Sequence, residues 1–325
     1  MREIINSISV GGLTAVYRRE SETGVVELVL IPAGCESEIV RTDCAAEPLV
    51  QAKLETDDAP AFFSGARTMR NGPTVSAIVF DGQIVQKSDD KTVILTTLTD
   101  ARGLAYTHTL TLYADNPAAE VVTSVENTGS APVTFEMLSS FTLGSISPFA
   151  TGLAPETLKI HRLRSTWSAE GRLVTDRAED LQLEPSWKCY SANCLRFGVI
   201  GGYPVHGFAP FCAVEDTVHG VTWAAATTQG SSWQMELYRS DMGLSLSGGL
   251  ADREFGAWCK TLAPGACFTA PKAVLTAVRG GVDAAAQVLA ENTRRSVEPI
   301  LPESEKAMPV LFNEFCSTWG SPTEE

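Results

Sequence analysis

The sequence is poor in basic side chains. It has 25 Lys and Arg against 39 Asp and Glu, which gives a net charge of −14 and a pI of about 4.8. A surface this acidic repels phosphate backbones and anionic lipids, so we expect neither nucleic acid nor a membrane as partner. The charge is compatible with a neutral ligand.

The sequence also lacks metal-binding and membrane-spanning patterns. It has only four His, and none of its eight Cys forms a C-x-x-C pair, so we expect no zinc site. Cys189 and Cys194 could approach each other in a loop, but the pattern favours reduced thiols. No apolar run reaches the roughly 18 residues that a spanning helix needs, and no apolar segment of a signal peptide follows Met1. These features indicate a cytoplasmic protein.

Short catalytic motifs are absent as well. The sequence contains no G-x-S-x-G elbow, no Walker loop and no G-x-G-x-x-G after a strand, so phosphate chemistry is not expected and no cofactor is predicted. With 39 acidic residues, carboxylate pairs arise by chance. Counting therefore assigns no catalytic residue.

Residues 1–280 read as strand after strand. The segment 92–113 has two β-rich arms around a turn at 100–103, and Leu110 and Leu112 alternate with Thr109 and Thr111. Further hairpin turns are predicted at the positions 127–130, 229–230 and 241–243. Turn signals at intervals of about ten residues favour an antiparallel β-sandwich over βαβ units.

The pattern changes after residue 280. The Ala-rich segment 282–296 predicts one helix, with Asp283 in its first turn and Arg294 and Arg295 in its last. The predicted apolar stripe consists of Val282, Ala285, Ala286, Leu289 and Thr293. Pro299 and Pro302 follow the helix. The run 309–312 then reads as a buried parallel strand that delivers polar and aromatic groups at its end.

Three segments have side chains that suit a binding site. Segment 159–187, dense in Arg, acids and two Trp, is either a sugar-contacting loop or an ion-paired surface hairpin. Segment 248–278 carries Asp252, Arg253 and Trp258 on a strand-to-strand connection, or uses them in an inter-sheet turn with a core Trp. The third segment, 206–220, has spacing that fits no standard metal site, and Glu215 and Asp216 read as a turn.

The chain resembles glycoside hydrolase family 36, the α-galactosidase and melibiase family, in three segments. "RLRSTWSAEGR" with "LEPSW" and "GVTWAAATTQGSSWQMEL" is similar to a family loop and strand. "FGAWCKTLAPGACFTAPKAVLT" resembles F-x-W-x-L-x-P-G-E-x-F-x-T-P-E-A-V-L, and "PVLFNEFCSTWG" resembles the family's first barrel strand. The three segments appear in the family's order and spacing, over roughly residues 162–319.

The resemblance implies a mainly β fold. It predicts a large antiparallel, galactose-mutarotase-like β-supersandwich at 1–280, a linker helix and Pro-rich segment at 281–308, and one leftover (β/α)₈ barrel strand at 309–325. A whole barrel takes roughly 250 residues. The family's two catalytic aspartates lie on later barrel strands, so the resemblance assigns no catalytic residue here.

The resemblance also selects substrate-binding candidates. Asn313 and Phe315 align with the Asn and aromatic residue of the family's first strand, and Trp319 stands near a Tyr. Cys316 stands where many members have Glu, which indicates a divergent subgroup. Trp258 aligns with the Trp before L-x-P-G, and the neighbouring Asp252 and Arg253 are added as candidates. Segment 55–65 matches only weakly a family loop that closes a neighbour's site.

Three functional hypotheses remain open. The first is the non-catalytic N-terminal part of a retaining α-galactosidase, inactive alone and acting with α-galactosides. The second is a stand-alone carbohydrate-binding or interaction module. The third is a mutarotase-like epimerase, which needs a His and a Glu converging in a sheet concavity; the candidates are His108, His161, His206 and His219. A homo-oligomer is compatible with the apolar tail.

Overall fold

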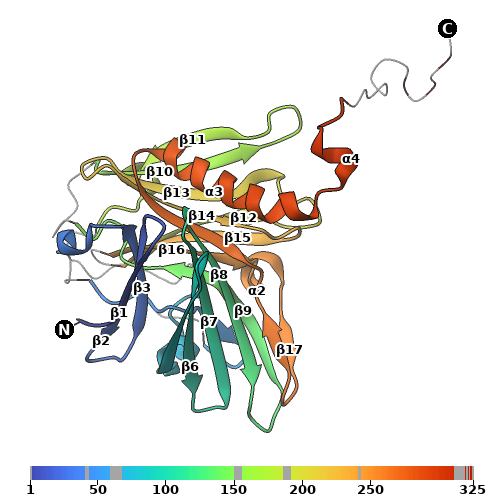
Figure 1. Ribbon diagram of the computed structural model, residues 1–325. Coiled ribbons are helices and arrows are strands. Elements are labelled where there is room, and N and C mark those ends of the chain that lie inside the picture. The colour runs from blue at the N-terminus through green and yellow to red at the C-terminus, as the bar shows by residue number, and fades with distance from the viewer. Residues whose placement is uncertain are drawn as a thin grey trace.

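The computed structural model describes most of the chain. The described residues are 2–40, 44–58, 68–149, 156–185, 192–240, 243–310, 319, 321 and 323. Strands dominate them, and the strand pairs of this described part are antiparallel, as the turn spacing predicted. Figure 1 shows three sheets that pack together, with one long helix on their outside. In the described part of the chain, no helix is long and apolar enough to cross a membrane.

The N-terminal sheet is a three-stranded meander. Its strands are β1 (Arg2–Val10), β2 (Leu13–Glu20) and β3 (Val26–Pro32). All of β3 is buried, which explains why its sequence is an almost unbroken apolar run. The first turn uses Gly11 and Gly12, whose φ angles of 59° and 89° favour glycine.

The largest sheet has ten strands. In spatial order it contains β11 (Arg172–Arg177), β10 (Leu158–Ser165), β13 (Gly207–Asp216), β14 (Val221–Thr227), β19 (Ala273–Arg279), β8 (Asn116–Asn127), β7 (Leu104–Tyr113), β6 (Lys91–Asp100) and β5 (Val79–Lys87), with β18 (Cys267–Thr269) paired to β8. The hairpin predicted at 100–103 joins β6 to β7, with Asp100 opposite Leu104. Leu110 and Leu112 are buried and their Thr neighbours half-buried, which confirms the predicted alternation.

The third sheet has six strands. It contains β12 (Ala192–Val199), β15 (Trp233–Ser240), β16 (Gly243–Leu250), β9 (Val133–Leu143) and β17 (Lys260–Leu262), with β4 (Ala52–Leu54) on β9. The predictions of hairpins at 127–130 and 229–230 are wrong. The turns at 127–130 and 229–230 join strands of the ten-stranded sheet to strands of this one, β8 to β9 and β14 to β15. Turn residues reverse the chain, but they do not decide whether it returns within its own sheet.

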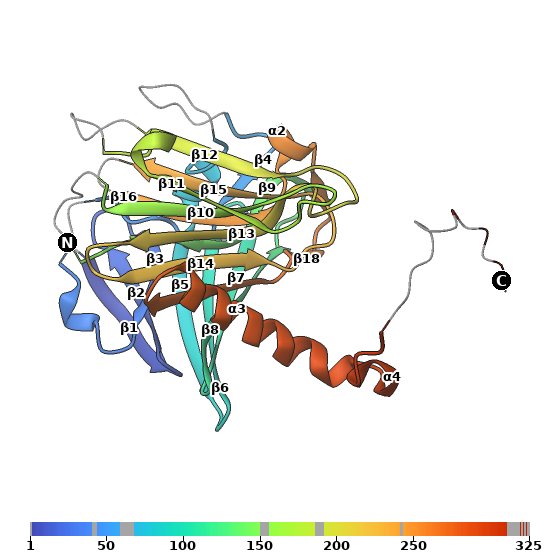
Figure 2. The same cartoon turned by 90° about the horizontal axis from the view of Figure 1, so that it is seen from above.

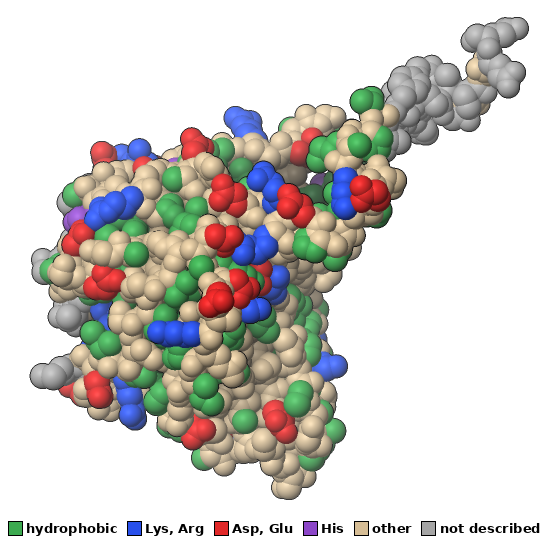
Figure 3. All heavy atoms as spheres, in the orientation of Figure 1, with side chains coloured by type: hydrophobic (Ala, Val, Ile, Leu, Met, Phe, Trp, Pro, Cys, Tyr) green, Lys and Arg blue, Asp and Glu red, His purple; other side chains and the backbone are tan. Residues whose placement is uncertain are grey.

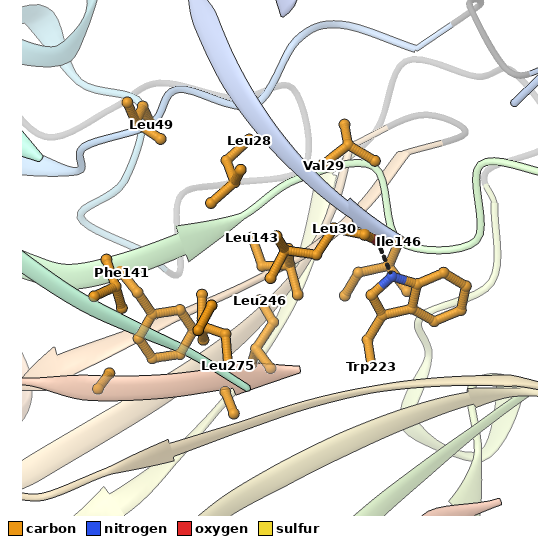
Figure 4. Packing of buried hydrophobic residues seen from close by; sticks show 14 of the residues in the cluster. Leu28, Val29, Leu30, Leu49, Phe141, Leu143, Ile146, Trp223, Leu246 and Leu275 are labelled. Carbon is orange, nitrogen blue, oxygen red and sulfur yellow. Dashed lines mark hydrogen bonds between the residues drawn. The ribbon is translucent and has the colours of Figure 1, made fainter. Parts of the chain in front are cut away.

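The core lies between the three sheets. Figure 4 shows Leu28 and Leu30 of β3 facing side chains from the other two sheets, including Leu246 of β16 and Leu275 of β19. Trp223 of β14 is 1% exposed, and its indole Nε1 donates a hydrogen bond to the Leu30 carbonyl oxygen at 2.7 Å. This contact fastens the three-stranded sheet to the ten-stranded one.

The predicted helix is α3 (Val282–Val297), which confirms the sequence interpretation. It packs on β19, β14 and β8, across the outer side of the ten-stranded sheet, as Figures 1 and 2 show. Its buried residues are Ala285, Val288, Leu289 and Asn292. The predicted stripe was therefore rotated: Ala286 and Thr293 are exposed, because the packed face follows the i, i+3, i+4, i+7 spacing from Ala285.

Short helical turns complete the described chain. They are η1 (Glu36–Glu38), α1 (Pro73–Ala77), η2 (Glu179–Leu181), α2 (Arg253–Gly256), η3 (Glu298–Ile300) and α4 (Glu303–Lys306). After α4, Met308 and Val310 are 83% and 99% exposed. Most of the segment predicted as a barrel strand lies outside the described residues, so the proposed division at 280 and 308 stays a prediction.

Candidate functional site

Asp252 holds together the turn in which it lies. Its side chain is 1% exposed and caps α2 by accepting a hydrogen bond from the Phe255 backbone N–H at 2.8 Å. Gln234 of β15 completes the arrangement: its Nε2 donates to Asp252 Oδ2 at 2.8 Å, and its Oε1 accepts from the Asp252 N–H at 3.0 Å. The carboxylate of this substrate-binding candidate is thus occupied by its own protein.

The two neighbouring candidates differ in exposure. Arg253 is exposed on α2, whereas Trp258 is half-buried and packs against the main core. The ring centroids of Trp258 and Phe268 lie 5.6 Å apart at an interplanar angle of 41°. This packing agrees with the alternative interpretation in that Trp258 contacts the core, but the turn joins β16 to β17 of the same six-stranded sheet rather than two sheets. A sugar contact by Trp258 or Arg253 stays a prediction.

Two of the three tail candidates lie outside the described residues. Asn313 and Phe315 lie outside the described residues, and so does Cys316. Trp319 is 77% exposed. Most of the weakly matched segment at 55–65 is likewise outside the described residues. These assignments stay predictions.

The Arg-rich segment is an ion-paired hairpin. Arg162 of β10 contacts Asp176 of β11 at 2.6 Å, and Arg177 contacts Asp180 at 2.7 Å. Trp167, at the turn of the hairpin, is 91% exposed. Exposed indole faces suit sugar stacking. The ion pairs therefore fit the surface-hairpin interpretation, and the exposed Trp167 is compatible with the sugar-contacting one.

Glu215 and Asp216 end strand β13 rather than form a turn, which corrects the sequence prediction. Successive strand residues point to opposite faces. Glu215 Oε2 therefore meets His161 Nε2 at 2.9 Å, whereas Asp216 Oδ2 meets His219 Nδ1 at 2.7 Å. His206 is exposed on a loop. The described residues contain no group of three or more His, Cys, Asp or Glu placed to hold a metal ion.

Among the described residues, His161 and Glu215 form a His–Glu pair of the kind that epimerase chemistry needs. His161 is 3% exposed, its Nδ1 contacts Thr175 Oγ1 at 2.9 Å, and burial lowers its pKa below the usual value. Its partner Glu215 lies beside Gly281, where α3 begins. His108 is fully buried, and burial lowers its pKa to about 4. At 0% and 3% exposed, the His108 and His161 side chains are closed off from solvent.

A cavity of about 270 Å³ lies where the three-stranded and six-stranded sheets meet. Its walls come from the β2–β3 turn, residues 44–48, helix α1 and strands β15 and β16. The lining residues are Glu20, Thr23, Val25, Cys44, Ala45, Ala46, Glu47, Pro48, Asn71, Val75, Ser76, Ser145, Tyr238, Ser240, Gly243, Leu244 and Ser245. Its volume is just below the range of roughly 300–1,000 Å³ typical of small-molecule sites.

Arg70 does not line the cavity but contacts several residues that do. This 2% exposed side chain pairs with Glu47, donates a hydrogen bond to Ser245 Oγ at 3.0 Å and lies 5.0 Å from the centre of the Tyr238 ring. Glu236 lies 3.8 Å from Arg70, and burial raises the pKa of its carboxyl. The lining groups are therefore held by buried charges, a preorganised arrangement typical of binding sites.

A second buried ion cluster lies beside the same cavity. Glu27 accepts contacts of 2.7 Å from both Arg2 and Arg18, and all three side chains are at most 5% exposed. The lining residue Ser145 donates to Glu27 at 2.9 Å and accepts from Arg18 at 2.9 Å. Neither cluster was predicted from the sequence, because the members of each come from distant strands and loops and form no local motif.

Comparisons with known proteins agree with the fold. No protein-family model matches the sequence, and no curated protein is similar to it in sequence. A family 36 α-galactosidase from Geobacillus stearothermophilus, solved with stachyose, superposes with a TM-score of 0.64 at 14% identity over 87% of this chain and 42% of that chain. An α-galactosidase from Lactobacillus brevis gives 0.62 at 14% identity over 88% and 41%.

The galactosidase domain of an α-galactosidase–sucrose kinase gives a TM-score of 0.62 at 12% identity, over 87% of this chain and 41% of that one. The chain therefore has the fold of part of the family 36 α-galactosidases, as the sequence resemblance predicted. It spans about two-fifths of the length of these structures, which is consistent with an N-terminal domain.

Proposed function

We propose that this chain is the non-catalytic sandwich part of an α-galactosidase-like retaining glycoside hydrolase. The carrying observation is the shared fold, which extends over 87% of this chain but only 42% of a family 36 enzyme. The three sequence segments, found in the family's order, support the same interpretation. The substrate of the whole enzyme would be an α-galactoside.

The described residues also bear on catalysis. Retaining hydrolysis needs two accessible carboxyl groups about 5–5.5 Å apart, one as nucleophile and one as acid. In the cavity, Glu47 Oε1 already accepts from Arg70 and from Gln51 Nε2, the latter at 2.9 Å. Asp252 is engaged by α2 and Gln234. These carboxylates stabilise the fold, so the sandwich would support and shape a barrel that supplies the reacting groups.

Hydrolysis of p-nitrophenyl α-galactoside by the purified chain tests the non-catalytic role. We expect no release of nitrophenol above buffer. Steady turnover that survives repurification would refute the proposal. Sequencing the gene beyond the codon for Glu325 tests the rest: a frame that continues into a (β/α)₈ barrel supports it, and an immediate stop codon contradicts it.

The partner we propose is a neutral carbohydrate. Acidic and basic side chains are interspersed over the face in Figure 3, and the net charge of −14 disfavours polyanions. Cytoplasmic location is part of the proposal and is supported by the described cysteines 35, 44, 212, 259 and 267, which form no disulfide. A stand-alone carbohydrate-binding module is the second candidate, because the cavity has a polar wall.

A further inference from the structure

We propose that the cavity between the β2–β3 turn, α1 and strands β15 and β16 is a binding site for one neutral polyhydroxylated ring, such as a hexose. The proposal deepens the proposed function, on which it rests for the choice of galactose as the first probe. The site is distinct from the turn that carries Trp258, because Trp258 does not line the cavity.

The lining suits hydroxyl groups. It includes the residues Glu47, Asn71, Tyr238, Ser240 and Ser245, whose side chains carry a carboxylate, an amide, a phenol and two alcohols. A sugar hydroxyl both donates and accepts, so it needs mixed partners of this kind. The remaining wall is apolar, with Val25, Val75, Pro48 and Leu244 available to C–H groups. Such a mixture of apolar wall and a few placed polar groups is typical of small-molecule sites.

The polar wall is fixed in place before any ligand arrives. Arg70 holds Glu47 and Ser245, and Gln51 Nε2 donates to Asn71 Oδ1 at 2.7 Å. The backbone N–H of Asn71 donates to Gln51 Oε1 at 2.9 Å, so the amide pair is reciprocal. A wall with immobilised side chains loses little conformational entropy on binding.

The charges favour a neutral ligand over an ion. Among the described residues, the lining includes Glu20 and Glu47 but no Lys, Arg or His, so an anion would meet carboxylates there. A cation would compete with Arg70, which already contacts Glu47 and is 2% exposed. The described residues also lack a metal-binding group. A neutral polyol meets neither obstacle.

Ligand-observed NMR and calorimetry with the full chain test the site. The probes are D-galactose, D-glucose and myo-inositol, with D-galacturonate and D-galactosamine as charged counterparts. We expect saturable binding of at least one neutral probe, tighter than either charged one. Absence of binding by all three neutral probes at their highest usable concentration overturns the proposal, and so does tenfold tighter binding of a charged probe.

A cavity-filling variant locates the binding. Ala45 is exposed and lines the cavity, so Ala45→Leu narrows it without disturbing the core and should weaken binding at least tenfold. Ala77→Leu is the matched control, because Ala77 is exposed at the end of α1 and does not line the cavity. Ser76→Leu, on the lining face of α1, replaces Ala45→Leu if that variant does not fold. Equal affinities in the lining and control variants overturn the proposal.

Tyr238→Phe tests the polar contact itself. It keeps the ring over Arg70 and removes one hydroxyl, so affinity should fall about fivefold, the effect of one neutral hydrogen bond. An unchanged affinity contradicts a role for this hydroxyl and with it the proposed wall. The hydrolysis assay tests a separate claim. If the chain neither binds a sugar nor hydrolyses the galactoside, only the proposed binding site is refuted. If it hydrolyses the galactoside, only the proposed non-catalytic role is refuted.

Discussion

Trp223→Phe should loosen the contact between two sheets. Trp223 is 1% exposed, and its Nε1 donates to the Leu30 carbonyl oxygen at 2.7 Å (Figure 4). Phenylalanine keeps an aromatic ring but removes the N–H donor and part of the ring volume. The Leu30 oxygen then loses this donor in a place that water does not reach.

The magnitude follows from these two losses. Removing one partner of a buried hydrogen bond costs about 1–3 kcal/mol. Partial loss of a buried aromatic side chain adds a cavity term, well below the roughly 3–5 kcal/mol of a full Trp→Ala truncation. Together they predict a decrease of about 2–4 kcal/mol in the free energy of unfolding.

Urea unfolding followed by far-ultraviolet circular dichroism measures this decrease. We expect a lower midpoint with an unchanged m-value, because the surface exposed on unfolding stays nearly the same. Trp167→Phe is the control, since Trp167 is 91% exposed and its replacement should change the free energy by less than about 0.5 kcal/mol. Equal midpoints for the two variants would refute the idea that Trp223 fastens the sheets.

Three further changes test other buried features. Burial lowers the pKa of His108 to about 4, so below pH 6.5 the unfolded chain binds more protons than the folded chain. The contribution of neutral His108 to the free energy of unfolding should therefore be complete above pH 6.5 and fall by about 3 kcal/mol at pH 4. Urea unfolding between pH 7 and 4 should show a smaller fall for His108→Gln. Arg70→Met leaves the buried Glu47 carboxylate without its cation, and Glu236 with Arg196 alone, and should destabilise by about 3–5 kcal/mol in urea. Arg177→Met, in an exposed pair, should not measurably shift the midpoint. Gly103→Ala should lower the melting temperature, because Gly103 has φ +85° and a Cβ there would lie 2.7 Å from the Gly129 backbone. An unchanged melting temperature would contradict this close packing.

Local patterns predicted local structure well. The alternation at 104–113 and the Ala-rich run at 282–296 correspond to β7 and α3, because strand and helix periodicity depend on neighbours in sequence. The same patterns did not predict which sheet a strand joins, because strand pairing depends on residues far apart in the sequence. The turn at 229–230 reads like a hairpin yet joins two sheets, since only the packing of both sheets decides where β15 pairs.

The candidate site shows the same limit more sharply. Asp252 looked like a ligand-binding acid, although an Asp before Arg253–Gly256 is also the pattern of a helix N-cap, and that signal was overlooked. Sequence offers no comparable signal for the cavity. Glu47, Arg70 and Tyr238 come from two loops and a strand, so only the folded chain brings them together.

The buried charges behind the cavity argue that this wall has a role beyond stability. Burying an ion pair costs desolvation that its attraction often fails to recover, and apolar replacements of similar volume are often more stable. The sandwich already has a large core, so folding alone does not require Arg70 between Glu47 and Glu236. Arg70 does fix the Glu47 carboxylate and the Ser245 hydroxyl at the cavity wall. Oriented polar groups facing a space of about 270 Å³ are useful to a protein that binds a small polar molecule there.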